Sequence, residues 1–183
     1  MTAYDAYTAW VAANPLLSAA AHFAVLGTLG EVIAHWIGAR RLAGLPCTAA
    51  QLGLKAVAWA VLGVIIKYGF ALMKGGAAAL VEHGLMPRAL GSGVGYALLV
   101  SVLTNLLFGP QMMAFHRWED NVILRRRGYA GIQRAWWTLI WFWIPAHTVT
   151  FSLPRDLQIP LAAVWSVVLG VILGLTAARP SGR

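Results

Sequence analysis

The chain has 183 residues, of which 60% are hydrophobic and only 11% are charged. A soluble domain of this size is nearer half apolar and a quarter charged, so the composition excludes an ordinary soluble fold and favours an integral membrane protein. In such a protein the formal net charge of +8 reports topology and anionic lipid, and we do not expect a nucleic-acid partner. The single cysteine, Cys47, excludes an internal disulfide and a cysteine-based metal cluster.

Five stretches are long and apolar enough to cross a bilayer, which takes about 20 residues. They predict an all-α, polytopic membrane bundle forming one domain over residues 1–183, with spans at about 16–38, 51–73, 90–115, 134–153 and 157–178. Residues 74–86 are too polar to span and too apolar for a plain linker. They leave open a short interfacial helix, a continuation of the second span or a segment that re-enters the membrane.

Lysine and arginine are distributed unevenly along the chain. Ten lie after the first span, early in the second, in 116–134 or in the C-terminal tail: Arg40, Arg41, Lys55, Arg117, Arg125, Arg126, Arg127, Arg134, Arg179 and Arg183. Only Lys74, Arg88 and Arg155 lie on the opposite side. Because cytoplasmic loops carry the excess of basic residues, five spans predict an outside N-terminus and a cytoplasmic C-terminus. Arg125, Arg126 and Arg127 are expected either to bind anionic headgroups or simply to set this topology.

The first two spans carry ionisable side chains. Glu31 and His35 are four residues apart, on one helical face, and could share a proton. Charged groups inside a bilayer cost about 2.5–3.5 kcal/mol each, so they normally face the bundle interior or a water-filled cavity. Lys67 is expected either to pair with Glu31 or to snorkel to the headgroups, whereas Lys55 lies near a helix end and is expected to snorkel.

The third and fourth spans add neutral polar groups. Asn105 is expected either to bond to a neighbouring helix or to contact a ligand, and His147 taken alone is typical of a satisfied interior histidine. Pro110 and Pro145 are expected to kink their helices. Four of the five spans thus carry polar groups near mid-membrane, which predicts one common cavity. Its expected lining residues are Glu31, His35, Lys67, Asn105, His147 and Thr150.

These motifs have the order and spacing of a known family. Gly30-Glu31-x-x-x-His35 stands where that family has Gly-Asp-x-x-x-Gln. Thr104-Asn105 through Pro110 has the spacing of its Asp-Gln and downstream Pro. The family's Trp-Pro-x-x-Gln-x-x-Asn-Phe pattern, which ends in Val-Pro, corresponds to Trp143, His147, Thr150-Phe151 and Leu153-Pro154. The chain therefore resembles the Mpv-seventeen family, which includes the twenty-two-kilodalton peroxisomal membrane protein. Most of the family's polar residues are replaced here by other polar types, and its Tyr-Arg after the fourth span is missing.

The resemblance implies a channel or transporter that moves an ion or small solute, with Glu31 and His35 as a protonatable switch and Lys67 as the counter-charge. The rival hypothesis is a structural or accessory subunit of a membrane complex, whose polar groups only lock helices together. Under either hypothesis the expected protein partners are a second copy of the chain or a membrane complex. A third hypothesis is an intramembrane enzyme using Glu31 and His35. No phosphate loop, H-E-x-x-H or nucleophile elbow occurs, so we expect no enzyme activity, metal or cofactor. The alanine-rich composition and an N-terminal segment without Lys or Arg favour a bacterial inner membrane.

Overall fold

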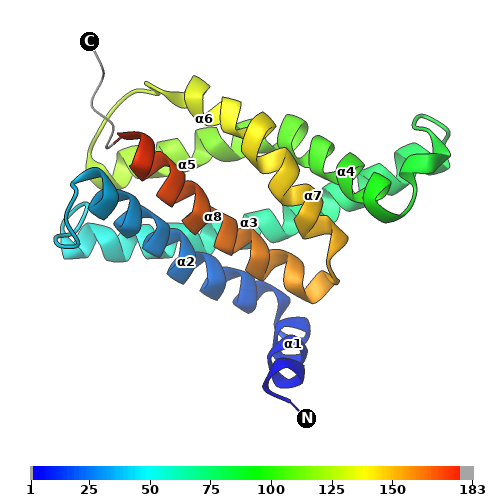
Figure 1. Ribbon diagram of the computed structural model, residues 1–183, viewed down its shortest axis with the longest axis horizontal. Helices are drawn as coiled ribbons and strands as arrows, with labels where there is room; N and C mark the ends of the chain where they lie inside the picture. Colours follow the sequence, from blue (N-terminus) through cyan, green and yellow to red (C-terminus); the bar gives the residue numbers. More distant parts are fainter. Residues whose placement is uncertain (1, 178–183) are drawn as a thin grey trace.

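The computed structural model describes residues 2–177, and all the regular secondary structure in that range is helical. No β-strand occurs in that range, which confirms the predicted all-α class. In chain order the elements are α1 (Ala3–Ala13), α2 (Pro15–Gly38), α3 (Ala49–Glu82), the 3-10 turn η1 (Arg88–Leu90), α4 (Gly93–Leu103), η2 (Thr104–Phe108), α5 (Gly109–Leu124), α6 (Ile132–Thr138), η3 (Leu139–Trp143), α7 (Ile144–Ser152) and α8 (Arg155–Ala177) (Figure 1).

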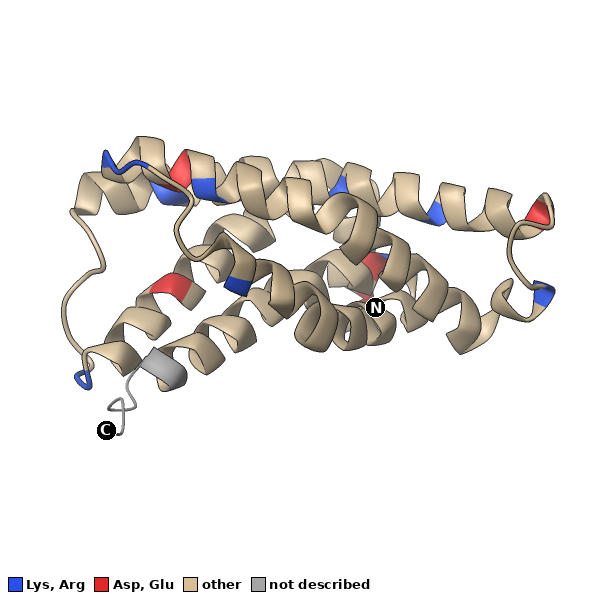
Figure 2. Ribbon diagram, turned by 90° about the horizontal axis from the view of Figure 1, so that it is seen from above, with Lys and Arg blue, Asp and Glu red and all other residues tan. Residues whose placement is uncertain are grey.

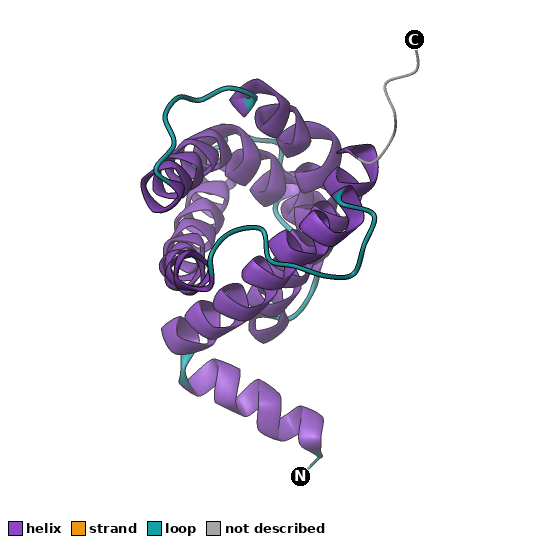
Figure 3. Cartoon of the chain, turned by 90° about the vertical axis from the view of Figure 1, so that its left-hand side faces the viewer, coloured by secondary structure: helices purple, strands orange, loops and turns teal. Residues whose placement is uncertain are grey.

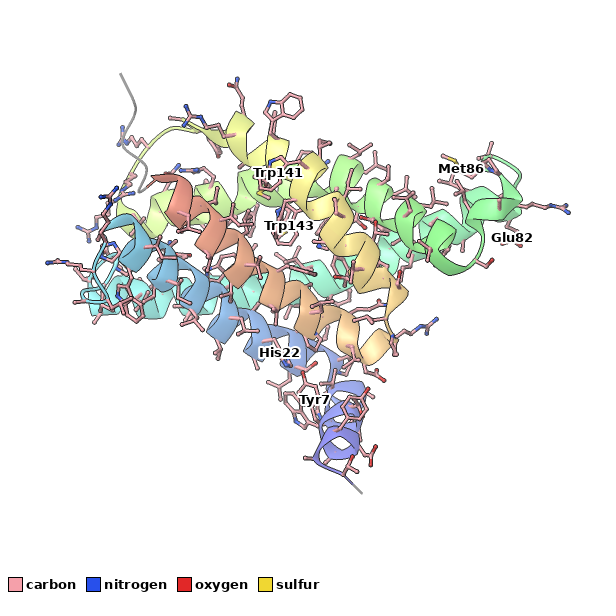
Figure 4. The ribbon with its side chains drawn as sticks, viewed as in Figure 1. Tyr7, His22, Glu82, Met86, Trp141 and Trp143 are labelled. Atoms are coloured by element: carbon pink, nitrogen blue, oxygen red, sulfur yellow. The ribbon has the colours of Figure 1, made fainter. Side chains whose placement is uncertain are left out.

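The elements after α1 form five rods that run alternately in opposite directions: α2, α3, α4 with η2 and α5, α6 with η3 and α7, and α8 (Figure 1). Helix α1 projects from this bundle (Figure 3). A hydrogen bond of 2.7 Å between the Tyr7 hydroxyl and Nε2 of His22 ties α1 to α2 (Figure 4). The second ring nitrogen of His22 lies 2.6 Å from the carbonyl oxygen of Ser18. That carbonyl can only accept, so Nδ1 carries a proton, and in the neutral imidazole Nε2 accepts from Tyr7.

Four helical stretches are long and apolar enough to cross a membrane: Pro15–Gly38, Ala49–Glu82, Gly93–Leu124 and Arg155–Leu175. The fourth expected span, 134–153, is a helical rod over residues 132–152, but its tryptophans and polar groups leave it outside those four. Helix α3 continues through Glu82, so most of 74–86 extends the second span, and the short separate helix is α1 instead. At 1.5 Å per residue the 34 residues of α3 measure about 51 Å, more than the roughly 30 Å hydrocarbon layer.

Small residues let α2 and α8 approach each other closely. A Cβ on Gly170 would lie 2.6 Å from the carbonyl oxygen of Gly30, and a Cβ on Gly174 would lie 3.0 Å from that of Ala34. Gly30-x-x-x-Ala34 and Gly170-x-x-x-Gly174, two spacings that place small residues on one helical face, therefore pack against each other. Small residues at this spacing are typical of close helix pairs in membranes. The third such spacing, Gly91 and Gly95, instead meets backbone oxygens of the adjacent turn.

Two prolines each follow a π-helical turn. Pro110 is the second residue of α5, directly after η2, and Pro145 is the second residue of α7, directly after η3. A proline has no N–H for the carbonyl four residues earlier, and its ring would clash with that carbonyl. A wider π turn before the ring relieves the clash, and such turns are frequent at functional sites. The two turns contact each other in neighbouring rods.

The two ends of the bundle differ in character. The buried hydrophobic core, which includes Phe70, Val100, Phe151 and Ile159, fills the end where α2 begins and α3 ends. Basic residues gather at the opposite end, around the segments that follow α2 and α5 (Figure 2). Arg125, Arg126 and Arg127 are exposed there. Arg179 and Arg183 lie outside the described residues.

Candidate functional site

A buried lysine lies at the centre of an ion cluster near the basic end. Nζ of Lys55 is 2.7 Å from Oε2 of Glu31 and also bonds Oδ1 of Asp120, so α2, α3 and α5 meet at one ammonium group. The Lys55 side chain is only 4% exposed, whereas the Glu31 and Asp120 side chains are 22% and 27% exposed. A lysine this deeply buried keeps its charge because two carboxylates replace its lost hydration.

This cluster corrects the expectations for both lysines. Lys55 was expected to snorkel outward, but it points inward and takes the role of Glu31's partner that was considered for Lys67. Lys67 is half-buried and has no side-chain ion pair or hydrogen bond within residues 2–177. It lies seven residues before Lys74, whose Nζ bonds Oε1 of Gln158 at 2.9 Å.

The indole of Trp59 stands beside the ion cluster. Its Nε1 donates to Oε1 of Glu31 at 2.7 Å, and its ring lies 4.5 Å from the ring of His116 between centroids. On its other side it packs directly over Gly27, where an added Cβ would lie 2.3 Å from Cδ2 of Trp59. Only glycine leaves room for the indole here. Nδ1 of His116 in turn lies 2.9 Å from Oε1 of Glu119.

Two hollows adjoin this indole. The first, which we call the vestibule, has a volume of about 400 Å³ and reaches the surface, because exposed Gly131 and Arg134 are among its lining residues. It is also lined by Glu31, Asp120 and Arg117. The second, which we call the inner cavity, has a volume of about 100 Å³ and is lined by no exposed residue. Five residues line both hollows: Trp59, Met113, His116, Trp143 and Ser166.

A chain of hydrogen bonds fixes the polar side of the inner cavity. Nδ2 of Asn105 donates to the carbonyl oxygen of Ser101 at 2.8 Å, and it lies 3.1 Å from Nδ1 of His147. The hydroxyl of Ser101 donates to the carbonyl oxygen of Ile144 at 2.7 Å. Asn105 and His147 are 1% and 8% exposed. These hydrogen bonds fix the orientation of the Asn105 and His147 side chains close to the π turns η2 and η3.

Two polar atoms on residues that line the inner cavity are buried without a partner. They are Oγ1 of Thr104 and Nε1 of Trp143. Buried polar atoms are rarely left unpaired in proteins, because each carries a desolvation penalty of about 1–3 kcal/mol. Unpaired groups beside a cavity are therefore a sign of a site that a bound molecule can complete.

The six predicted lining residues divide into three groups. Asn105 and His147 share the inner cavity, and Glu31 lines the vestibule. His35, Lys67 and Thr150 line neither hollow. Thr150 donates to the carbonyl oxygen of Ala146 and accepts from Nε1 of Trp165 at 3.1 Å, which makes it a packing contact between α7 and α8. The proton-sharing pair of Glu31 and His35 is not formed, since Glu31 is engaged by Lys55 and Trp59.

Sequence reasoning missed four residues that build this region: Trp59, His116, Glu119 and Asp120. The ligand atoms of Glu31, His116 and Asp120 lie within 4.8 Å of one another, which would suit a cation in geometry alone. The Lys55 ammonium already lies against both carboxylates and supplies the positive charge there. The cluster is therefore an ion-pair network rather than a metal centre.

Comparisons of the chain with protein-family models, with curated proteins and with solved structures find no match. The resemblance to the Mpv-seventeen family thus stays a prediction from the sequence. The function has to be argued from the site itself.

Proposed function

We propose that the protein is a small membrane transporter whose solute reaches the inner cavity from the vestibule at the basic end. The observation that carries this proposal is the shared wall: five side chains, Trp59 among them, lie between a hollow open to the surface and a mostly apolar inner cavity that contains Asn105 and His147. Beyond Asn105 and His147 the bundle is filled by its apolar core. This arrangement suits a carrier open to one side, in which movement of the wall and repacking of the core alternate access.

The proposed membrane arrangement uses all five rods as spans, with 132–152 as the fourth. Five spans put the basic end in the cytoplasm and the start of α2 outside, and they put the arginines after α5 at anionic headgroups. Bacterial inner membrane remains the proposed location. The resemblance to the Mpv-seventeen family implies the same functional class.

A cysteine block tests the proposal. In a Cys47→Ser background, Ser166→Cys places a thiol in the shared wall, and Val164→Cys places one on the same helix at an exposed position, 41% accessible and outside both hollows. We expect a thiosulfonate reagent to inhibit solute flux into proteoliposomes only for Ser166→Cys, with recovery on reduction. Equal inhibition of both variants, or of neither while flux is present, would count against the proposed path.

The accessory-subunit hypothesis has its own supporting observation. Part-buried polar contacts tie rods together, including Ser101 to Ile144, Thr150 to Trp165 and Lys74 to Gln158. That hypothesis expects a larger complex to co-purify and proteoliposomes to show no flux of any small solute. Size-exclusion chromatography with light scattering distinguishes it from a transporter that acts as a monomer or homo-oligomer.

A further inference from the structure

The lining of the inner cavity contains no formally charged side chain of Asp, Glu, Lys or Arg among the described residues. It is mostly aromatic, aliphatic or methionine, with a few polar groups around Asn105 and His147. An ion in such a place would lose its hydration and gain no counter-charge, which is strongly unfavourable. His116 is the second histidine of the lining, and it lies in the shared wall, beside the carboxylate of Glu119.

The hydrogen-bond chain determines the tautomer of His147. The carbonyl of Ser101 can only accept, so the nitrogen of Asn105 that lies 2.8 Å from it must be the amide NH₂. The same NH₂ lies 3.1 Å from Nδ1 of His147 and 3.4 Å from the hydroxyl of Ser101, so the shorter contact favours Nδ1 as the acceptor of its second hydrogen. His147 is then neutral with its proton on Nε2. This N–H has no protein partner among the described residues and belongs to a side chain that lines the cavity.

The volume of the inner cavity sets the size of an occupant. Water takes about 30 Å³ in the liquid, and a dry cavity of about 150 Å³ holds benzene. A cavity of about 100 Å³ therefore suits a molecule of about four or five non-hydrogen atoms. Its mostly apolar lining requires that the molecule have an apolar part and only as many polar groups as the few around Asn105 and His147 can satisfy.

We propose that the solute of the inner cavity is a small uncharged molecule with an apolar body and one hydrogen-bond acceptor, which receives the N–H of His147. The hydroxyl of Thr104, buried without a partner, can adapt as donor or acceptor to the same polar end. Small amides and related neutral carbonyl compounds have this chemistry. The inference rests on the proposed function for transport, but binding to the cavity is measurable without it.

Three molecules of one shape separate the charge states. Acetamide, acetate and acetamidinium each have four non-hydrogen atoms and are neutral, anionic and cationic at pH 7. Binding to the purified full-length protein in detergent is measured by ligand-observed NMR, and flux is measured in proteoliposomes against protein-free liposomes. We expect acetamide to bind at least about tenfold more tightly than either ion, because neither ion finds a counter-charge in the cavity.

Variants and isotope labelling test the role of His147. His147→Phe removes the N–H donor and is expected to weaken acetamide binding about five- to tenfold. The control Val149→Ala changes an exposed residue of the same helix, 52% accessible, and is expected to leave binding unchanged. Nitrogen-15 NMR of the unmodified protein is expected to show His147 protonated at Nε2 only. A His147 protonated at Nδ1, or doubly protonated, at pH 7 would overturn the inference whether or not either variant folds.

The outcomes separate this inference from the proposed function. Flux or tighter binding of acetate or acetamidinium would refute the uncharged solute while leaving a transporter in place. Binding of acetamide at the cavity without flux of any of the three would refute transport and support the assigned ligand class. If none of the three binds or crosses, both ideas fail.

Discussion

Replacing Lys55 by methionine is expected to destabilise the protein strongly. Methionine keeps the length of the aliphatic stem but removes the ammonium, so Glu31 and Asp120 are left as neighbouring carboxylates without their shared cation. At an effective dielectric constant of about 20, one pair at 2.7 Å attracts by about 6 kcal/mol before the cost of desolvation is subtracted. Removing one partner of a buried pair typically costs about 3–5 kcal/mol.

We expect the lower end of that range for Lys55→Met, about 3 kcal/mol, because the two carboxylates are about a quarter exposed and water screens them. The matched control is Lys67→Met, on the same helix. Lys67 is half-buried and unpaired within residues 2–177, so its replacement is expected to change the free energy of unfolding by less than about 1 kcal/mol. Unfolding by titration with a denaturing detergent, followed by circular dichroism, measures both.

A second replacement separates the ion pair from other effects of Lys55. In the double variant Lys55→Met with Glu31→Gln, one carboxylate charge is removed together with the ammonium, so part of the lost stability is expected to return. A loss below about 1 kcal/mol for Lys55→Met would refute the ion-pair assignment. An equal loss for Lys67→Met would refute it as well.

Three further predictions follow from particular contacts. Gly27→Ala places a methyl group against the Trp59 indole and is expected to cost about 1–3 kcal/mol in unfolding free energy and to alter flux. The control Gly75→Ala, whose new Cβ would have nothing within 4 Å, is expected to be neutral or stabilising. Equal effects of the two variants would contradict the packing of Trp59. Pro145→Ala restores a backbone N–H in α7 and is expected to let the π turn η3 relax to α-helix. The residues after the turn would then rotate by about 100° about the helix axis, which abolishes the Asn105–His147 hydrogen bond. An unchanged nitrogen-15 spectrum of His147 would contradict that role for the proline. Cys47 follows α2 at the basic end, so an impermeant maleimide is expected to label it in inverted vesicles but not in intact cells. Ser92→Cys in a Cys47→Ser background is expected to give the opposite result. Because burial raises the pKa of the Cys47 thiol, labelling of Cys47 should speed up as the pH rises above neutral.

Hydropathy located the rods, because apolar runs of about 20 residues have few alternatives to a helix in a membrane. The signal is weakest for the rod at 132–152, which is less apolar than the other four. Hydropathy left open whether the second span would continue through 74–86. The helix α3 does continue to Glu82, because the polar residues after Met73 do not break a helix whose backbone remains hydrogen-bonded. The two prolines, Pro110 and Pro145, predicted kinks but did not indicate π turns. The choice between a kink and a π turn depends on packing against the neighbouring rod.

The partner of Glu31 could have been found by counting from the loop between α2 and α3. Glu31 lies eight residues before Ala39, and Lys55 lies seven residues after Thr48, so both are about 10–12 Å from that loop. Lys67 lies nineteen residues, about 28 Å, after Thr48 and cannot reach Glu31 in an antiparallel pair. Asp120 and His116 required knowledge of how α5 is rotated about its axis, which a single sequence does not contain.

The charge pattern of the vestibule bears on the uncharged solute proposed for the inner cavity. Two carboxylates, Glu31 and Asp120, and two guanidinium groups, Arg117 and Arg134, line the vestibule together, so neither sign of charge dominates its walls. Lys55 adds a cation that both carboxylates already neutralise in part. A path built for an anion or a cation would concentrate one sign of charge at its mouth, because such a field raises the local concentration of the ion. The vestibule lies at the basic end of the bundle, but its own walls carry both signs of charge and lead to a cavity without formal charge, which favours selection by size and hydrogen bonding.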